Sequence, residues 1–512
     1  MNRGSLTALA LALATLGAIW LPDAHAQTKP ALVAATGADI VTLDPTKVTS
    51  GNDYLFFSNV FESLYGHDET GKLVPTLAES VAISPDGLVY TFKLRRNVKF
   101  HNGDAFTAED VRFSWQHAVD PASRNPRANV LAANIADVEI IDALQVRIKL
   151  KTRDASLLEN MDTYWLMVPK NHHAKVGREA YARQPVGTGP FAFVERRVKE
   201  YIKLKGFDAH WGRAPKVGDV TIKIVPDDLA RIAQIQTGEA DLVINVPPAI
   251  AAPLRRDPNI KVISAPSYNN LFVSINNRGN NPDLKKKEVR QALNIAVNKN
   301  ALSRSLLLTF ATPQELFCNP GVIGCEGQVD AFYYDPKKAR DMLVKAGFDF
   351  NRPLKLIGVA EGRYAASKQT VEGIAYDLSQ IGVKTNLSIM EYGAWLGIVT
   401  PKTKDPSVDM VFVGNTDYNN DPSGRLLKFA VTDGANSFYS DPALDKDLLK
   451  MNDFSSAKER SVYISKLFKR IHDDALFMPL WSVQSIYAAR SNIQWKPTPA
   501  VSWPILWNIE KK

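Results

Sequence analysis

Alternation of buried strands with amphipathic helices is the feature that most limits the folds open to this chain. Residues 220–225 (VTIKIV) predict one strand and residues 241–245 predict another. Between them, residues 227–237 predict a helix that ends at Gly238. A strand, a helix and a strand at this spacing form a βαβ unit with parallel strands, so the chain is predicted to be an α/β protein. The apolar face of that helix is assigned to Leu229, Ile232 and Ala233.

The same pattern returns in the second half of the chain. Residues 354–359 predict a strand, and residues 369–381 predict a helix that ends at Gly382. Residues 383–389 and 409–413 predict two further strands. Two α/β units this far apart predict two lobes, each with its own sheet, and the lack of a low-complexity linker predicts ordered segments crossing between them. The inner stripe of the second helix is assigned to Val371, Ile374, Ala375, Leu378 and Ile381.

Residues 42–185 have a different sequence pattern from the two α/β units. Tyr90, Phe92 and Leu94 alternate as in a half-buried strand. The pair Asn102-Gly103 is typical of a turn. This segment is therefore predicted to add a subdomain of mixed strands and helices to the first lobe.

The first 26 residues are expected to be removed as a secretory signal peptide. Arg3 precedes an apolar run over residues 7–21, and Ala24-His25-Ala26 forms a small-residue cleavage site before Gln27. The run is shorter than the roughly 20 apolar residues of a membrane span, although an uncleaved anchor helix is the alternative. No cysteine stands at the cleavage point to carry a lipid. We therefore expect a periplasmic protein with a cleavable signal peptide and no lipid anchor.

Length and composition exclude several classes of protein. At about 150 residues per domain, 512 residues indicate roughly three domains. Apolar residues make up 45% and charged residues 23%, which is typical of globular proteins and excludes a disordered, collagen-like or polytopic membrane protein. The net charge of +8 is spread along the chain without a Lys/Arg stripe, so no nucleic-acid partner is expected.

The two cysteines, Cys318 and Cys325, close a short loop, CNPGVIGC. An exported chain meets oxidising conditions, so we expect these two residues to form a structural disulfide. The alternative, a dithiol redox site, usually has the C-x-x-C spacing, which this sequence lacks.

Sequence signatures of catalysis and of cofactor or metal binding are missing. No serine has glycines two positions before and after it, and there is no H-E-x-x-H motif. His172 and His173 are adjacent, so a solvated loop is preferred over a metal site. The segment Gly66–Lys72 resembles a phosphate-binding loop, but Leu73 replaces the Ser or Thr that magnesium binding needs, so a turn is preferred. No enzymatic activity, cofactor or metal is therefore expected.

The positive signal is the set of side chains that follow the predicted strands. In open α/β sheets, ligands bind beyond the carboxyl ends of the strands. Arg363 could bind a ligand carboxylate, Asp417 could hold an ammonium group, and the aromatic rings could supply apolar walls. This combination suits a small zwitterion such as a short peptide, whereas the alternative for each residue is a loop charge or a structural salt bridge. The candidate ligand-binding residues are Asp417, Arg363, Tyr392, Asp39, Asn415 and Tyr364.

Short motifs spread over nearly all of the mature chain carry a family resemblance. They include residues 60–64 (VFESL), 84–87 (SPDG), 100–103 (FHNG), 185–191 (PVGTGPF), 237–241 (TGEAD) and 289–293 (VRQAL). Together they resemble the periplasmic solute-binding proteins of dipeptide, oligopeptide, glutathione and nickel ABC importers, the bacterial extracellular solute-binding proteins of family 5.

The resemblance implies a two-lobed periplasmic-binding-protein fold of the α/β class, with an extra α+β subdomain on the first lobe. In peptide-binding members, an Asp at the position of Asp417 holds the terminal amine of the peptide. Arg363 lies near the position of a carboxylate-binding Arg, and Asp39 and Tyr392 match cleft positions. Such members often carry Trp shortly before the Asp, where this chain has Gly414-Asn415. The implied boundaries are 27–50, 186–265 and 482–512 for the first lobe, 51–185 for the subdomain and 266–481 for the second lobe.

The function implied by the resemblance is capture of a short peptide between the lobes and its delivery to ABC permease subunits in the inner membrane. The protein is then expected to be a monomer without enzymatic activity. Within the family, the alternatives are a glutathione-like peptide, an opine-type conjugate or a nickel chelate. From other classes, the alternatives are a secreted hydrolase and a chaperone-like or signalling binder without a transport partner.

Overall fold

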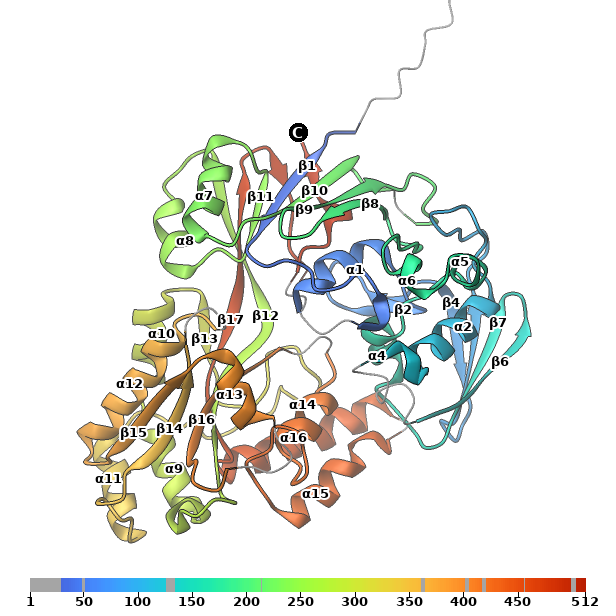
Figure 1. The fold of residues 1–512 in the computed structure, drawn as a ribbon. Helices are drawn as coiled ribbons and strands as arrows, with labels where there is room; N and C mark the ends of the chain where they lie inside the picture. The colour runs from blue at the N-terminus through green and yellow to red at the C-terminus, as the bar shows by residue number, and fades with distance from the viewer. Residues whose placement is uncertain are drawn as a thin grey trace, which may run out of the picture.

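The computed structural model describes residues 29–47, 51–125, 134–212, 214–360, 364–400, 405–416, 420–454, 456–498 and 503–512. The predicted signal peptide lies outside these residues. Figure 1 shows two α/β lobes, one above the other, with a subdomain beside the first lobe. This is the predicted fold class. No helix within the described residues has both the length and the apolar character needed to cross a membrane.

The first lobe contains the predicted βαβ unit. Strand β1 (Leu32–Thr36) lies between β10 (Asp219–Ile224) and β11 (Leu242–Ile244) and is parallel to both. Helix α7 (Asp228–Thr237) connects β10 to β11. Leu229 is 71% exposed and Ala233 is exposed too, so the assignment of these two residues to the apolar face is wrong. The apolar side chains of α7 that are buried in the core are Ile232 and Ile235.

The remaining elements of this lobe are β8 (Phe191–Arg197), β9 (Tyr201–Gly206), α1 (Tyr54–Val60), α8 (Pro248–Leu254), β18 (Ile493–Gln494) and β19 (Glu510–Lys511).

The second lobe is built around three parallel strands. Strand β14 (Leu354–Val359) lies between β15 (Thr385–Met390) and β16 (Met410–Thr416). Helix α12 (Ser367–Gln380) covers them, and its predicted stripe is buried apart from the partly exposed Ala375. The helices of this lobe besides α12 are α9 (Lys287–Ile295), α10 (Lys299–Leu307), α11 (Pro336–Lys345), α13 (Tyr392–Val399), α14 (Ser423–Phe429), α15 (Pro442–Leu449) and α16 (Ala457–Asp473).

Two long antiparallel strands join the lobes. Strands β12 (Ile260–Ile275) and β17 (Phe477–Arg490) run from the upper lobe into the lower one in Figure 1. Strand β12 pairs with β16 of the second lobe, whereas β17 pairs with β11 of the first and with the short β13 (Ala311–Pro313). The predicted crossing segments are therefore present. The prediction of a separate sheet in each lobe is wrong, because these strands make one continuous 11-stranded sheet.

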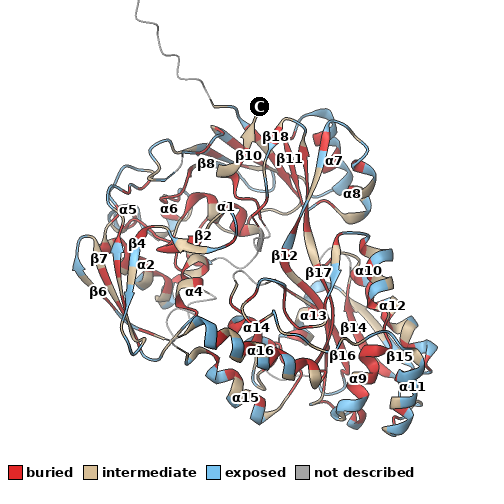
Figure 2. Ribbon diagram, turned by 180° about the vertical axis from the view of Figure 1, so that it is seen from behind, coloured by how far each residue is buried: buried red, intermediate tan, exposed pale blue. Residues whose placement is uncertain are grey.

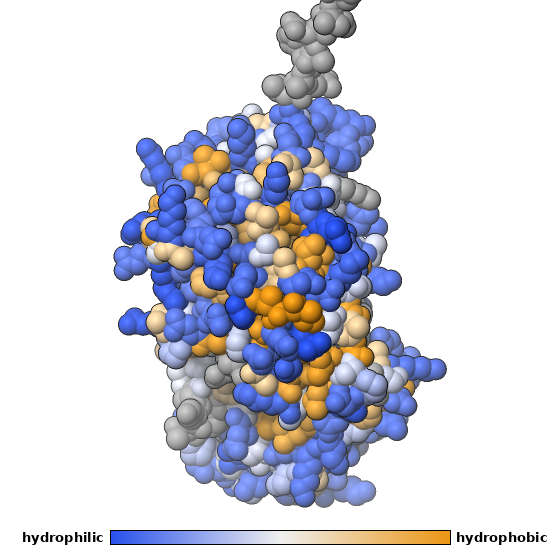
Figure 3. Space-filling view, turned by 90° about the vertical axis from the view of Figure 1, so that its right-hand side faces the viewer, coloured by the Kyte–Doolittle hydropathy of each residue, from blue (hydrophilic) through white to orange (hydrophobic). Residues whose placement is uncertain are grey.

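The inserted subdomain has its own sheet and core. Its four antiparallel strands, in the order β4-β5-β7-β6, pack with helix α2 around a cluster of buried side chains (Figure 2). Figure 3 shows this side of the molecule, where orange apolar residues gather near the middle of a mostly polar face. The elements are β4 (Ala78–Ile83), β5 (Val89–Leu94), β6 (Ile135–Asp142), β7 (Gln145–Leu150), α2 (Ala108–Val119), α4 (Leu157–Tyr164), α5 (Lys170–Val176) and α6 (Arg178–Tyr181).

The segment that resembles a phosphate-binding loop is a hairpin. Strands β2 (Tyr65–His67) and β3 (Leu73–Pro75) pair antiparallel. In the turn between them, one carboxylate oxygen of Asp68 accepts hydrogen bonds from the backbone N–H groups of Thr70 and Lys72. The turn thus satisfies its own polar groups.

His101 fastens the subdomain to the first lobe. Its Nε2 donates to the carbonyl oxygen of Gly189 at 2.9 Å, while its Nδ1 accepts from the backbone N–H of Gly187 at 3.2 Å. A Cβ atom at Gly187 would lie 2.0 Å from the carbonyl oxygen of Val60, so this close approach requires glycine. Burial lowers the pKa of His101 to about 4. Protonation would also convert Nδ1 from an acceptor into a donor and break the bond from Gly187.

We predict that His101 contributes to acid unfolding. Its pKa is about 4 in the folded state and about 6.5 in an unfolded chain, so the unfolded state binds more protons between these values. The free energy of unfolding should therefore fall by roughly 1–3 kcal/mol as the pH drops from 6.5 to 4, and His101→Gln should lose less over this window. Urea unfolding at several pH values measures this difference.

The control, His172→Gln at a partly exposed histidine, should follow the wild type. Equal pH slopes for His101→Gln and the wild type would contradict the assignment.

Candidate ligand-binding site

The carboxyl ends of β14 and β16 meet at one edge of the second lobe. The two strands are parallel neighbours, so the residues that follow them lie side by side. The Tyr364 hydroxyl, five residues past β14, donates to the carbonyl oxygen of Gly414 in β16 at 3.0 Å. Asn415, the next residue of β16, is buried. Arg363 and Asp417 lie outside the described residues, although each is adjacent in sequence to one that is described at this edge.

An aromatic cluster lies at this edge. The ring of Trp395 in α13 packs at 6.1 Å from Tyr364 and stacks at 5.8 Å on Tyr392, with distances measured between ring centroids. The indole N–H of Trp395 donates to the carbonyl oxygen of Phe412. Tyr392 is 43% exposed, whereas Tyr364 and Trp395 are buried. The structure thus brings the two predicted tyrosines together through Trp395, which the sequence analysis missed. The spacing of one helical turn between Tyr392 and Trp395 could have indicated that the two rings share a helix face.

The carboxylate of Asp39 forms hydrogen bonds and an ion pair with residues of the first lobe. Its carboxylate accepts hydrogen bonds from the backbone N–H groups of Ile40 and Lys199 at 2.7 and 2.8 Å. It also forms an ion pair with Arg196 at 3.1 Å. The geometry of Asp39 is therefore that of a structural salt bridge, which was the alternative considered for each candidate.

A disulfide loop supports the segment that follows Asp417. Cys318 and Cys325 are joined, with their Cα atoms 6.0 Å apart. Inside this loop, the backbone N–H of Ile323 donates to the carbonyl oxygen of Asn420 at 3.0 Å. The hydroxyl of Tyr268 in β12 donates to the Asn420 side chain. The disulfide loop and the crossing strand therefore both hold Asn420, which lies three residues after Asp417 in the sequence.

Asn420 also contacts the inserted subdomain. Its Nδ2 donates to the carbonyl oxygen of Gly71, in the β2–β3 turn, at 3.1 Å. A second contact between the second lobe and the subdomain is the bond from Arg153 to the carbonyl oxygen of Asp453 at 3.5 Å. The second lobe and the subdomain are thus in direct hydrogen-bonding contact.

A buried ion pair holds the residues after Asn420. Arg460 in α16 lies 2.6 Å from the carboxylate of Asp421, and both side chains are almost fully buried. The same guanidinium donates to the Ser423 hydroxyl and to the Asn452 side chain. Because a buried charge without its partner is costly, this network keeps residues 421–423 in one position.

Two histidines of the subdomain are packed together. His173 lies in α5 and is buried, with its ring centroid 4.5 Å from that of His117 in α2. The loop preferred for His172 and His173 is therefore wrong, because both lie in helix α5. His173 packs inward, whereas His172 is partly exposed. No cluster of three or more His, Cys, Asp or Glu side chains with metal-binding geometry occurs in the part of the chain that the structure describes.

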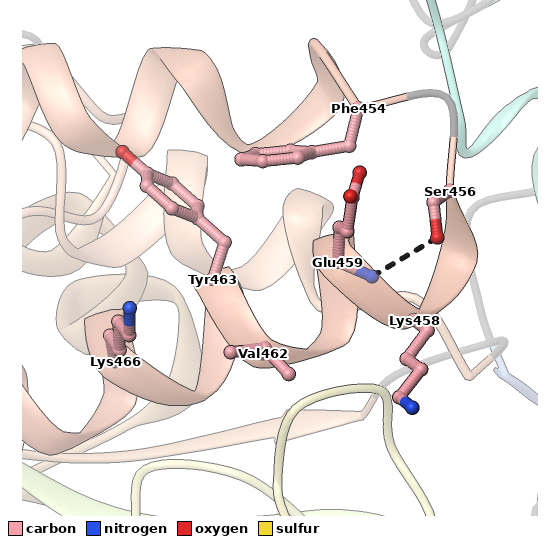
Figure 4. Close-up of a pocket in the computed structure, with 7 residues that line it drawn as sticks. All are labelled: Phe454, Ser456, Lys458, Glu459, Val462, Tyr463 and Lys466. Carbon is pink, nitrogen blue, oxygen red and sulfur yellow. Dashed lines mark hydrogen bonds between the residues drawn. The ribbon is translucent and has the colours of Figure 1, made fainter.

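A groove of about 490 Å³ lies along α16 (Figure 4). Ser456 caps this helix by accepting a hydrogen bond from the backbone N–H of Glu459. Helix α16 and the loop before it supply every residue that lines the groove, so it is a surface feature and not a site between the lobes. The lining residues are Phe454, Ser456, Lys458, Glu459, Val462, Tyr463 and Lys466.

Comparisons with known proteins agree with this architecture. A model of the bacterial extracellular solute-binding proteins, family 5 (middle region), matches residues 72–437. The glutathione-binding protein GsiB of Pectobacterium atrosepticum is 30% identical over 443 residues, which cover 84% of each chain. The same protein from Escherichia coli O157:H7 is 30% identical over 465 residues, or 88% of each chain.

Solved structures with the same fold include other binding proteins. The periplasmic binding protein DppA of Helicobacter pylori, in complex with the peptide STSA, superposes with a TM-score of 0.78 at 27% identity. The alignment covers 94% of this chain and 98% of DppA. The substrate-binding protein CtaP of Listeria monocytogenes gives a TM-score of 0.86 at 24% identity, with 95% and 100% covered. This chain therefore belongs to the bacterial extracellular solute-binding proteins of family 5.

Proposed function

We propose that this protein is the periplasmic binding component of an ABC importer. In this proposal it captures a short peptide between its lobes and hands it to permease subunits in the inner membrane, as a monomer without catalytic activity. The observation that carries the proposal is the meeting of the β14 and β16 strand ends in the second lobe. Asp417 follows one of these ends directly, and Arg363 precedes Tyr364 beside the other. Opposite charges at one sheet edge suit the two termini of a peptide.

The named ligands of relatives support a peptide of a few residues. Relatives at 30% identity are named for binding glutathione, which is a tripeptide, and the DppA structure at 27% identity contains the peptide STSA. Glutathione and other tripeptides are therefore the first ligands to test. The family resemblance placed Trp before the amine-binding Asp of many peptide binders, where this chain has Gly414-Asn415. A Cβ atom at Gly414 would lie 2.4 Å from the Tyr364 ring, so that ring packs directly against this position.

Transport favours moderate affinity and a reversible closure. A micromolar Kd corresponds to about −8 kcal/mol, which permits capture as well as release. The bond between Asn420 and Gly71 links the second lobe to the subdomain and must break if the lobes separate by a hinge motion. Its donor lies three residues after Asp417, so ligand binding and closure share one segment.

We predict that Asp417→Ala lowers tripeptide affinity at least 100-fold while leaving the melting temperature nearly unchanged. A ligand ammonium that loses its carboxylate partner in a closed site is left desolvated and unpaired, which is costly. Isothermal titration calorimetry with glutathione and with trialanine measures the loss. The matched control is Asp433→Ala, at an exposed aspartate of the same lobe, which should bind like the wild type. An unchanged affinity in Asp417→Ala would remove this residue from the site.

We further predict that the Cys318→Ser, Cys325→Ser double variant loses about 2 kcal/mol of unfolding free energy, because the short loop is no longer closed. Peptide affinity should fall as well, since Ile323 of this loop holds the Asn420 carbonyl. Denaturant unfolding and calorimetry report the two effects separately. A variant with unchanged affinity would show that the loop does not position the binding segment.

A further inference from the structure

A second cavity, of about 380 Å³, lies where the first lobe meets the inserted subdomain. Its walls come from segments that are distant in sequence. They include α1 and the residues after it, the β2–β3 hairpin, the end of α4, residues 210–212 and the C-terminal residues 503–507. One wall, the β2–β3 hairpin, also contacts Asn420 of the second lobe through Gly71. The cavity is therefore close to the segment proposed to bind the peptide, but its lining residues belong to the first lobe and the subdomain.

The walls of this cavity are rich in aromatic residues. Tyr54 and Phe57 lie three residues apart and present one face of α1 to it, and Phe61 follows directly after the helix. The ring of Trp503 stacks on Tyr54 with centroids 4.5 Å apart and an interplanar angle of 19°. The six aromatic residues that line the cavity are Tyr54, Phe57, Phe61, Trp211, Trp503 and Trp507.

The charged side chains of the lining are acidic apart from two histidines. Glu62, Asp68 and Asp162 line the cavity, together with His67 and His210. None of the described residues that line it is Lys or Arg, although the whole chain carries a net charge of +8. Among these lining residues, the carboxylates of Glu62, Asp68 and Asp162 therefore face one strongly basic group, the His67 imidazole, whose pKa is raised to about 10.

Neighbouring groups fix the orientation of these ionisable side chains. The His67 ring lies between two carboxylates, with Nδ1 at 2.7 Å from Asp162 and Nε2 at 3.0 Å from Glu159. Burial disfavours a charge on His67, but its hydrogen bonds to Asp162 and Glu159 outweigh this and raise its pKa to about 10. The Glu62 carboxylate accepts from the indole N–H of Trp211 at 3.0 Å and lies 3.1 Å from Nε2 of His210. The walls are thus held in place without a ligand.

We propose that this cavity binds an organic cation, an ammonium or guanidinium group carried on an apolar body. Aromatic faces attract cations and shelter hydrocarbon, and the Glu62 carboxylate supplies the opposite charge, since Asp162 is already paired with His67. Two sources of this chemistry are open to the protein, a free amine or the basic side chain of a bound peptide. The second source rests on the proposed function, whereas the first is independent of it.

The first experiment uses phenethylamine, which is a cation at pH 7, as the probe. The full mature chain is titrated with phenethylamine, with the uncharged analogue 2-phenylethanol and with the anionic analogue 3-phenylpropionate. Calorimetry and the fluorescence of the three tryptophans that line the cavity report binding. We expect phenethylamine to bind at least tenfold more tightly than the alcohol and 3-phenylpropionate not to bind. Absence of phenethylamine binding, or equal affinity for all three probes, would overturn the proposal.

Two variants locate the bound probe. Glu62→Gln removes a charge but keeps an acceptor for Trp211, and it should weaken phenethylamine at least tenfold without changing the affinity for the alcohol. Ser58→Phe fills the cavity from α1 and should abolish binding of both probes. The control, Asp86→Asn in an exposed turn of the subdomain, should bind like the wild type. If Glu62→Gln folds and binds phenethylamine like the wild type, the cation does not lie in this cavity.

A third comparison separates the two sources. Ala-Lys-Ala and Ala-norleucine-Ala differ only in the side-chain ammonium. If the side chain of a bound peptide enters the cavity, the wild type should bind the Lys peptide more tightly than the norleucine peptide. Glu62→Gln should then bind the two peptides equally. If Glu62→Gln weakens phenethylamine but affects both peptides equally, the cavity takes a free amine. If phenethylamine binds and neither peptide does, the cavity proposal stands while the peptide function fails. If peptides bind and phenethylamine does not, the peptide function stands while the cavity proposal fails.

Discussion

The hydrogen-bonded pair of β12 and β17 is the constraint on which the rest of the structure depends. These strands are 16 and 14 residues long, and they continue the sheet of one lobe into the other. Any relative movement of the lobes must therefore bend this two-stranded ribbon. Its register shifts between Ala265 and Asn269, which interrupts the ladder between the lobes. A break in regular pairing is a natural place for such bending.

Asn420 and the residues after it, which follow the proposed binding residue Asp417 in sequence, are held by several kinds of contact. The Cys318–Cys325 loop and the crossing strand support Asn420, while the buried pair of Arg460 and Asp421 anchors the residues after it. Asn420 also reaches the subdomain through Gly71. Residues 420–423 are thereby tied to the disulfide loop, a buried charge pair and the inserted subdomain. Such support reduces the ordering that a ligand would otherwise have to provide.

Local patterns predicted the regular elements but not the connections between distant ones. Strand β14 has the predicted limits, because its apolar run is short, continuous and followed by a helix of clear period. Strands β12 and β17 were missed since each contains a proline, Pro266 and Pro479, which a pattern analysis takes as a break. The contacts of Trp395 and the cavity beside α1 could not be predicted from local patterns, because they are formed by segments that are distant in sequence and meet only in the folded chain. The positions of Arg363 and Asp417 remain predictions from strand order.

The claim at the centre of this account is that the second lobe recognises a free ammonium group on a short peptide. Calorimetry with trialanine and with N-acetyl-trialanine tests it directly, because acetylation removes the positive charge and leaves the rest of the peptide intact. We expect tight binding of the free peptide and at least a 100-fold loss of affinity on acetylation. Equal affinity for the two peptides would contradict it.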